Sequence, residues 1–114
     1  MIWQEKLNAA LSGLYPVTKK PVTGPDPCYL TYEEVQGRYT AHASNQAQRI
    51  THMIQVDIFS RQAVGPELTE VRAALGLAGA NVVSWGPEQY EPDTRWHHLP
   101  ITCYMDERME EEHA

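Results

Sequence analysis

The chain has 114 residues, of which 42% are hydrophobic, and it carries 15 acidic side chains against 9 basic ones. This length suits one domain with a modest core that needs neither a metal nor a disulfide. No apolar run approaches the roughly 18 residues that span a bilayer, and the amino terminus lacks the order of a signal peptide. We therefore expect a soluble, cytosolic protein without a cofactor or a membrane partner.

The net charge of −6 is unevenly distributed along the chain. Residues 106–113 contain five acids and one base, a net of −4, which leaves −2 for residues 1–105. The larger part is nearly balanced and lacks the basic surface that duplex binding requires, so we expect no sequence-specific binding of nucleic acid. The charge pattern predicts a single domain over residues 1–105 and a frayed acidic tail over residues 106–114.

The first predicted element is an amphipathic helix over residues 1–14, where apolar side chains recur at helical spacing. Gly13 and Pro16 mark its end, because proline cannot continue a helix. Three prolines between residues 17 and 27 favour an edge segment or a loop. The next run, 28–35, is rich in β-branched and aromatic residues and predicts a strand.

Residues 36–48 are polar and small, which predicts a long hairpin loop or a flexible tip. Residues 49–60 alternate apolar and polar side chains and give the clearest strand, with one buried face. A second helix is expected to begin at Pro66 and to end at Gly79 or Asn81.

Two further runs, 82–85 and 94–105, have strand character, and Gly86-Pro87 opens a turn between them. The order of helix, strands, helix and strands is typical of the α+β class. It predicts an antiparallel or mixed sheet of four to five strands with two helices packed on one face.

The residue types of a metal site or a cysteine nucleophile gather in one run: Asp93, His97, His98 and Cys103. On one strand His97 and Cys103 lie roughly 20 Å apart, at about 3.3 Å per residue. The adjacent His97 and His98 point to opposite faces. These spacings favour ordinary polar residues, although a remote partner such as His52 stays open. Cys28 and Cys103 have no CxxC companion, so buried free thiols are favoured over a disulfide.

The remaining candidates for chemistry are paired carboxylates and tryptophans. Glu33-Glu34 and Glu110–Glu112 are interpreted as solubilising charge, and no phosphate loop, HExxH or GxSxG motif occurs. Trp3 is interpreted as core, whereas Trp85 and Trp96 suit either a core or an interface. The sequence therefore predicts neither a catalytic nor a metal site.

Several segments follow one another in a recognisable order: the first helix, Pro27-Cys28-Tyr29-Leu30-Thr31-Tyr32, the strand 54–60, the second helix, and Tyr90-Glu91-Pro92-Asp93-Thr94 before the last strand. Over nearly the whole chain this succession resembles the tail-completion, or tail-terminator, proteins of long-tailed bacteriophages. Members of that family are small α+β proteins that form a ring, typically a hexamer, at the head-proximal end of the tail tube. The ring stops polymerisation of the tube and offers a surface to the head connector.

The resemblance implies a structural virion protein with no active site, present in the host cytoplasm during assembly and then in the tail. Its partners would be copies of itself, the tail-tube protein and the head–tail connector protein. Another head–tail joining protein, such as a head-closure protein, is the first alternative, and a small metal- or thiol-dependent enzyme using His97, His98 or Cys103 is the second. The expected assembly-interface residues are Arg38, Tyr39, His42, Asn45, Gln46, Trp85 and Trp96.

Overall fold

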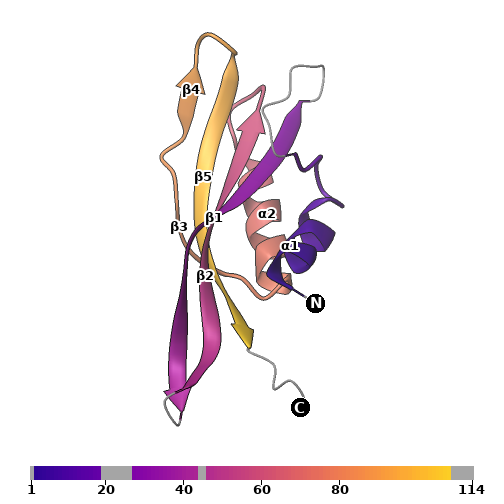
Figure 1. The fold of residues 1–114 in the computed structure, drawn as a ribbon. Helices are drawn as coiled ribbons and strands as arrows, with labels where there is room; N and C mark the ends of the chain where they lie inside the picture. The colour runs from indigo at the N-terminus through magenta and orange to yellow at the C-terminus, as the bar shows by residue number, and fades with distance from the viewer. Residues whose placement is uncertain (1, 19–26, 44–45, 109–114) are drawn as a thin grey trace.

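The computed structural model describes residues 2–18, 27–43 and 46–108, with the backbone alone for 40–43, 46–48 and 108. Two helices lie on one face of a five-stranded antiparallel sheet, which confirms the predicted α+β class (Figure 1). The elements are α1 (Trp3–Leu11), β1 (Cys28–Ala43), β2 (Gln46–Ser60), α2 (Pro66–Leu77), β3 (Asn81–Trp85), β4 (Gln89–Glu91) and β5 (Trp96–Arg108). Among the described residues, no helix is both long and apolar enough to cross a membrane.

The strand order is β1-β2-β5-β3, and the short β4 also pairs with β5. The central strands β2 and β5 carry the most apolar stretches, and their register places Val56 opposite Ile101 and Ile58 opposite Leu99. All four side chains are buried on the face that the helices cover. The alternation that predicted a one-sided strand over residues 49–60 is therefore confirmed.

The helices complete the core with buried side chains at helical spacing: Trp3, Leu7 and Leu11 from α1, and Val71 and Leu75 from α2. Burying one such side chain stabilises the fold by about 1.5–3 kcal/mol.

The Glu5 carboxylate accepts the backbone N–H of Ile2 at 3.1 Å and satisfies one free donor of the α1 amino terminus. Pro66 begins α2 as predicted, and Gly79 follows its end with a φ of +91°, a left-handed conformation that suits glycine.

The hairpin between β1 and β2 corrects the prediction of a long loop over residues 36–48. β1 continues to Ala43 and β2 begins at Gln46, so the backbone stays paired almost to the tip, with Tyr39 opposite Ile50. Only residues 44 and 45, which lie outside the described part, separate the strands. The loop prediction was wrong because it followed from the missing apolar alternation, which exposed side chains such as those of residues 36–39 do not need, while the backbone groups of the hairpin still pair.

We call residues 36–43 and 46–53 of this hairpin the arm. A bulge at Val35 separates it from the first part of β1 and shifts the register between Glu34 and Gln36. Figure 1 shows the hairpin extending past both helices and past the end of β5, and the chain is elongated, with extents of 53 × 24 × 22 Å. The tip of the arm is therefore a two-stranded ribbon, supported by neither a helix nor a third strand of the described chain.

The last strand also extends beyond its expected end at Met105. β5 runs to Arg108, where it pairs with Arg49 of β2, and thus takes in three residues of the predicted acidic tail. Those residues pair across to β2: the Thr51 hydroxyl donates to the Asp106 carboxylate at 2.8 Å. The rest of the predicted tail, residues 109–114, lies outside the described residues.

Candidate functional site

The two adjacent histidines of β5 each have a carboxylate partner of their own. His97 Nδ1 lies 2.9 Å from Glu88 Oε2, and His98 Nε2 lies 2.9 Å from Asp57 Oδ1. They do not share a ligand, as the alternation of a strand requires. Within the described ranges, no three histidine, cysteine, aspartate or glutamate side chains are placed to hold a metal ion.

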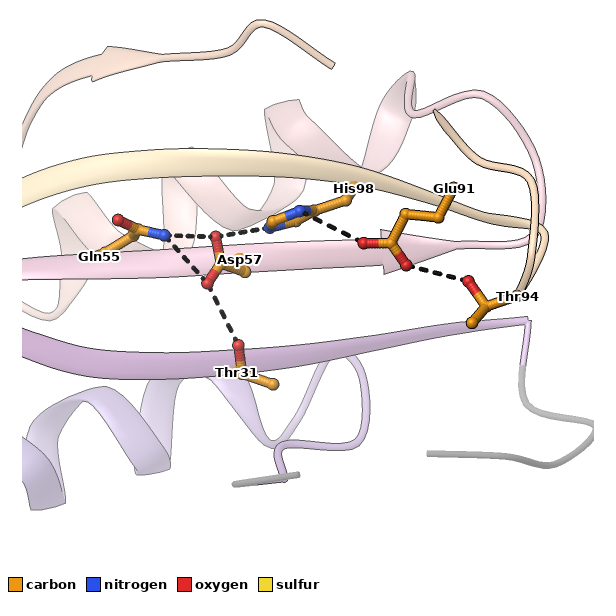
Figure 2. A network of polar contacts seen from close by, with 6 residues as sticks. All are labelled: Thr31, Gln55, Asp57, Glu91, Thr94 and His98. Carbon is orange, nitrogen blue, oxygen red and sulfur yellow. Dashed lines mark hydrogen bonds and ion pairs between the residues drawn. The ribbon is translucent and has the colours of Figure 1, made fainter. Parts of the chain in front are cut away.

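Asp57 is the centre of a polar network on the face of the sheet that carries no helix (Figure 2). It is 8% exposed and accepts hydrogen bonds from Gln55 at 2.9 and 3.2 Å, from His98 at 2.9 Å and from the Thr31 hydroxyl at 3.4 Å. The second ring nitrogen of His98 lies 4.0 Å from Glu91. A buried carboxylate needs such donors, and here they come from three neighbouring strands. The network therefore fixes β1, β2 and β5 to one another.

Beside this network, aromatic rings stack across the same three strands. Phe59 lies flat on His98, with ring centroids 4.4 Å apart, and on Tyr29 at 4.7 Å. Trp96 meets Tyr29 edge-on at 5.0 Å, and the Arg61 guanidinium covers Trp96 at 3.7 Å from its ring centroid. These contacts hold His98 in place through its ring as well as its nitrogen, which is a structural arrangement.

Cys28 and Cys103 are buried free thiols, as the sequence indicated. Burial raises the pKa of Cys28 to about 12, with a smaller contribution from the charges of Glu67 and Glu70. Burial also raises the pKa of Cys103 to about 11. Because the thiolate is the reactive form, both residues are poor nucleophiles at neutral pH.

A thiol-reactivity measurement checks this. In the folded protein both cysteines should react with Ellman's reagent at least about 100-fold more slowly than in urea, since each pKa unit lowers the thiolate fraction tenfold and burial blocks access. The release of thionitrobenzoate in native and denaturing buffer gives the two rates. Rapid native reaction of either cysteine would contradict the burial and restore the thiol-enzyme alternative.

The two tryptophans proposed for an interface lie in different environments. Trp96 is 4% exposed beneath Arg61 in the free chain, and its role at an interface stays a prediction. Trp85, at the end of β3, is 45% exposed, with the Arg72 guanidinium of α2 at 4.1 Å from its ring centroid. Trp3 is 6% exposed in the core. Of the two interface candidates, only Trp85 presents its ring to solvent.

The arm holds the remaining predicted interface residues. Arg38 is exposed, and Tyr39 is 60% exposed. The side chains of His42 and Gln46, and the whole of Asn45, lie outside the described residues. Within the described chain, only Val17 pairs with the outer edge of β1, at Leu30. An edge this long is a ready template for another chain.

A hollow of about 430 Å³ lies where the arm joins the helix-free face. Its floor and rim mix apolar and hydrogen-bonding side chains from four strands: Gln36, Arg38, Thr51, Met53, Asn81, Val83 and Tyr104. Val83 is 49% exposed, and within the described part of the chain Arg38 has no carboxylate partner. This hollow was not predictable from the sequence, because it depends on pairing between strands far apart in the chain.

No family model matches the sequence, and no curated protein matches it. Among solved structures, the chain is similar to one from the virion of a native gene transfer agent particle, with a TM-score of 0.53 and 10% sequence identity. The match covers 94% of this chain and 92% of that one. At such low identity the likeness establishes a shared fold over almost the full length, and it does not single out a tail terminator.

Proposed function

We propose that the protein is a structural component of a phage-like virion and that it acts as a tail terminator. In this role it closes into a ring at the head-proximal end of the tail tube, stops the polymerisation of the tube and presents a docking surface to the head connector. The observation that carries the proposal is the arm, which exposes the Tyr39 ring and an open strand edge beyond the helices. The fold shared with a chain of a gene transfer agent virion supports it.

The outer part of the arm is suited to contact between subunits, because beyond the pairing of Arg49 with Arg108 no third strand of the described chain lies beside it. A two-stranded ribbon is marginal in water unless a third strand or another surface packs against it. The arm exposes Tyr39, and the bulge at its root exposes Val35, which is 54% exposed. Aromatic residues on an interface supply much of its affinity. Packing the arm on a neighbour would therefore stabilise both the arm and the assembly.

The contact required is heterologous, since the arm of one copy must meet a different surface of the next. Repeating such a contact closes a ring when the rotation per subunit divides a full turn. The hollow beside Arg38 and the exposed ring of Trp85 are candidate receiving surfaces. We propose six copies per ring, with the tail-tube protein on one face and the connector on the other.

The charge of the chain is compatible with a ring through which DNA passes. Each lysine or arginine that contacts a phosphate adds affinity through counterion release. A net charge of −6, with only 9 basic residues, keeps such contacts few. The lumen would then let the duplex pass without holding it.

Shortening the arm tests the proposal. Because Arg38 pairs with Thr51, residues 39–50 can be removed and the two strands joined by Asn-Gly, which forms a tight two-residue turn. The shortened chain should still unfold cooperatively, with a circular dichroism spectrum that loses only the strand signal of the removed residues, but it should fail to form rings or to cap tail tubes in native mass spectrometry and electron microscopy. Unchanged assembly would rule out the arm as the assembly element.

The second candidate function is that of a head-closure protein, at the neighbouring position in the particle. The similar structure is described only as part of a virion, and head-closure proteins are also small and ring-forming. Purified tail-tube and connector proteins separate the two. A terminator retains the tube protein and caps it, whereas a head-closure protein binds the connector and leaves the tube ends bare.

A further inference from the structure

His52 occupies the root of the arm, on the helix-covered face of β2, and is 7% exposed. Its Nδ1 lies 2.6 Å from Glu34 Oε2 of β1, and its Nε2 lies 2.8 Å from Glu107 Oε1 of β5. The Trp3 ring of α1 packs against the imidazole, with centroids 5.3 Å apart. One side chain thus joins three strands and a helix at the point where the arm leaves the body.

The chemistry of this cluster requires a charged histidine. Carboxylates only accept hydrogen bonds, and a neutral imidazole has a single N–H, so both contacts of His52 are hydrogen bonds only when the ring carries two protons. Burial alone lowers the pKa of His52, but the hydrogen bonds and negative charges of Glu34 and Glu107 outweigh it and raise the pKa above 6.5. The imidazolium is therefore the form that this geometry stabilises.

The backbone at this site leaves room for the carboxylate. Gly37 is paired with His52 across the hairpin, and a Cβ at this glycine would lie 2.5 Å from Glu34 Oε2 and 3.7 Å from His52 Nδ1. Any larger residue at position 37 would displace the Glu34 carboxylate from the ring. The absence of a side chain at Gly37 is thus part of the cluster. This steric requirement does not depend on the protonation state of His52.

We infer that His52 is a positioning residue whose imidazolium, held between Glu34 and Glu107, fixes the direction of the arm and releases it on deprotonation. The groups that face it are one carboxylate from β1, one from β5 and the uncharged Trp3 ring from α1. The inference deepens the proposed function, on which it rests, since it makes the arm used for assembly sensitive to pH. A neutral ring would donate to one carboxylate only and turn a lone pair toward the other.

The direction of the pH dependence follows from the raised pKa. A histidine whose folded-state pKa lies above its unfolded value contributes its full stabilisation below about pH 6.5, the unfolded value, and loses it as pH rises through the folded pKa. The strand pairing at the arm root should therefore be most stable in mildly acidic solution, where the glutamates are still ionised. It should loosen as the solution becomes alkaline.

Two measurements on the isolated wild-type chain test this. Nitrogen NMR of the histidine rings should show His52 doubly protonated at pH 6.5, with a pKa above that value. Amide hydrogen exchange, corrected for intrinsic rates, should show protection at residues 34–38 and 50–53 falling about tenfold for each unit by which that pKa is raised. Protection in β3 serves as the internal reference. A pKa at or below 6.5, or arm-root protection that does not change between pH 6 and pH 9, would overturn the inference.

Variants separate positioning from simple packing. In His52→Gln the arm-root protection should be lower at pH 6 and independent of pH. His97→Gln, which removes a histidine–glutamate pair remote from the arm, should keep the wild-type pH profile. If His52→Gln does not fold, the two wild-type measurements decide alone. None of these readouts depends on ring formation. If the arm root loosens with rising pH while the arm-shortened chain still assembles, the positioning role of His52 is upheld and the proposed function is refuted.

Discussion

Replacing Leu7 by alanine should lower the free energy of unfolding by about 3–5 kcal/mol. Leu7 is fully buried between α1 and the sheet, in the same cluster as Val56 and Ile101. The truncation removes its apolar contacts and leaves a cavity that close-packed neighbours fill only in part. Urea unfolding followed by tryptophan fluorescence measures the loss, because Trp3 lies on the same helix.

Leu77 is the matched control for this prediction. It is also a helical leucine, at the end of α2, but is 91% exposed. Leu77→Ala should change stability by no more than about 0.5 kcal/mol. Equal losses for the two variants would mean that α1 does not pack on the sheet as described.

Replacing Tyr39 by alanine should weaken self-assembly by about 30-fold, which corresponds to about 2 kcal/mol. The side chain is 60% exposed on the arm, so the folded monomer loses little when it is removed. Its stability should change by less than about 0.5 kcal/mol. Sedimentation velocity over a concentration series gives the assembly constant, and thermal unfolding gives the stability.

Tyr90 provides the control for Tyr39. It is 53% exposed on the short strand β4, which pairs with β5 at the end opposite the arm. Tyr90→Ala should leave both assembly and stability close to wild type. If the two tyrosine variants assemble equally well, Tyr39 is not an interface residue and the arm loses its main anchor.

The architecture was predictable where one face of an element is buried. The helix over residues 1–14, the strand over residues 49–60 and the helix that begins at Pro66 all show apolar periodicity, and the structure contains each of them. Their ends differ by a few residues: α1 stops at Leu11 and β5 continues to Arg108. The ends of helices and strands depend on tertiary pairing more than on the local sequence pattern.

The arm and the cluster at its root were not predictable in the same way. Residues 36–48 lack apolar alternation, so the pattern that identifies strands is missing there, and the described side chains 36–39 are all exposed. Within that range, the aromatic Tyr39 and the β-branched Thr40 were the available sign of strand character. His52 and Glu107 are 55 residues apart, and only the antiparallel pairing of β2 with β5 brings them together.

We propose that the chain assembles through its arm into a ring that ends a tail tube. The most direct test is electron microscopy of the tail-tube protein of the same particle, polymerised in the presence of this chain or of its arm-shortened form. With the intact chain the tubes should carry a ring of this chain at one end, and with the shortened form they should stay bare. Tubes that stay bare with the intact chain, while the chain remains monomeric in the supernatant, would contradict it.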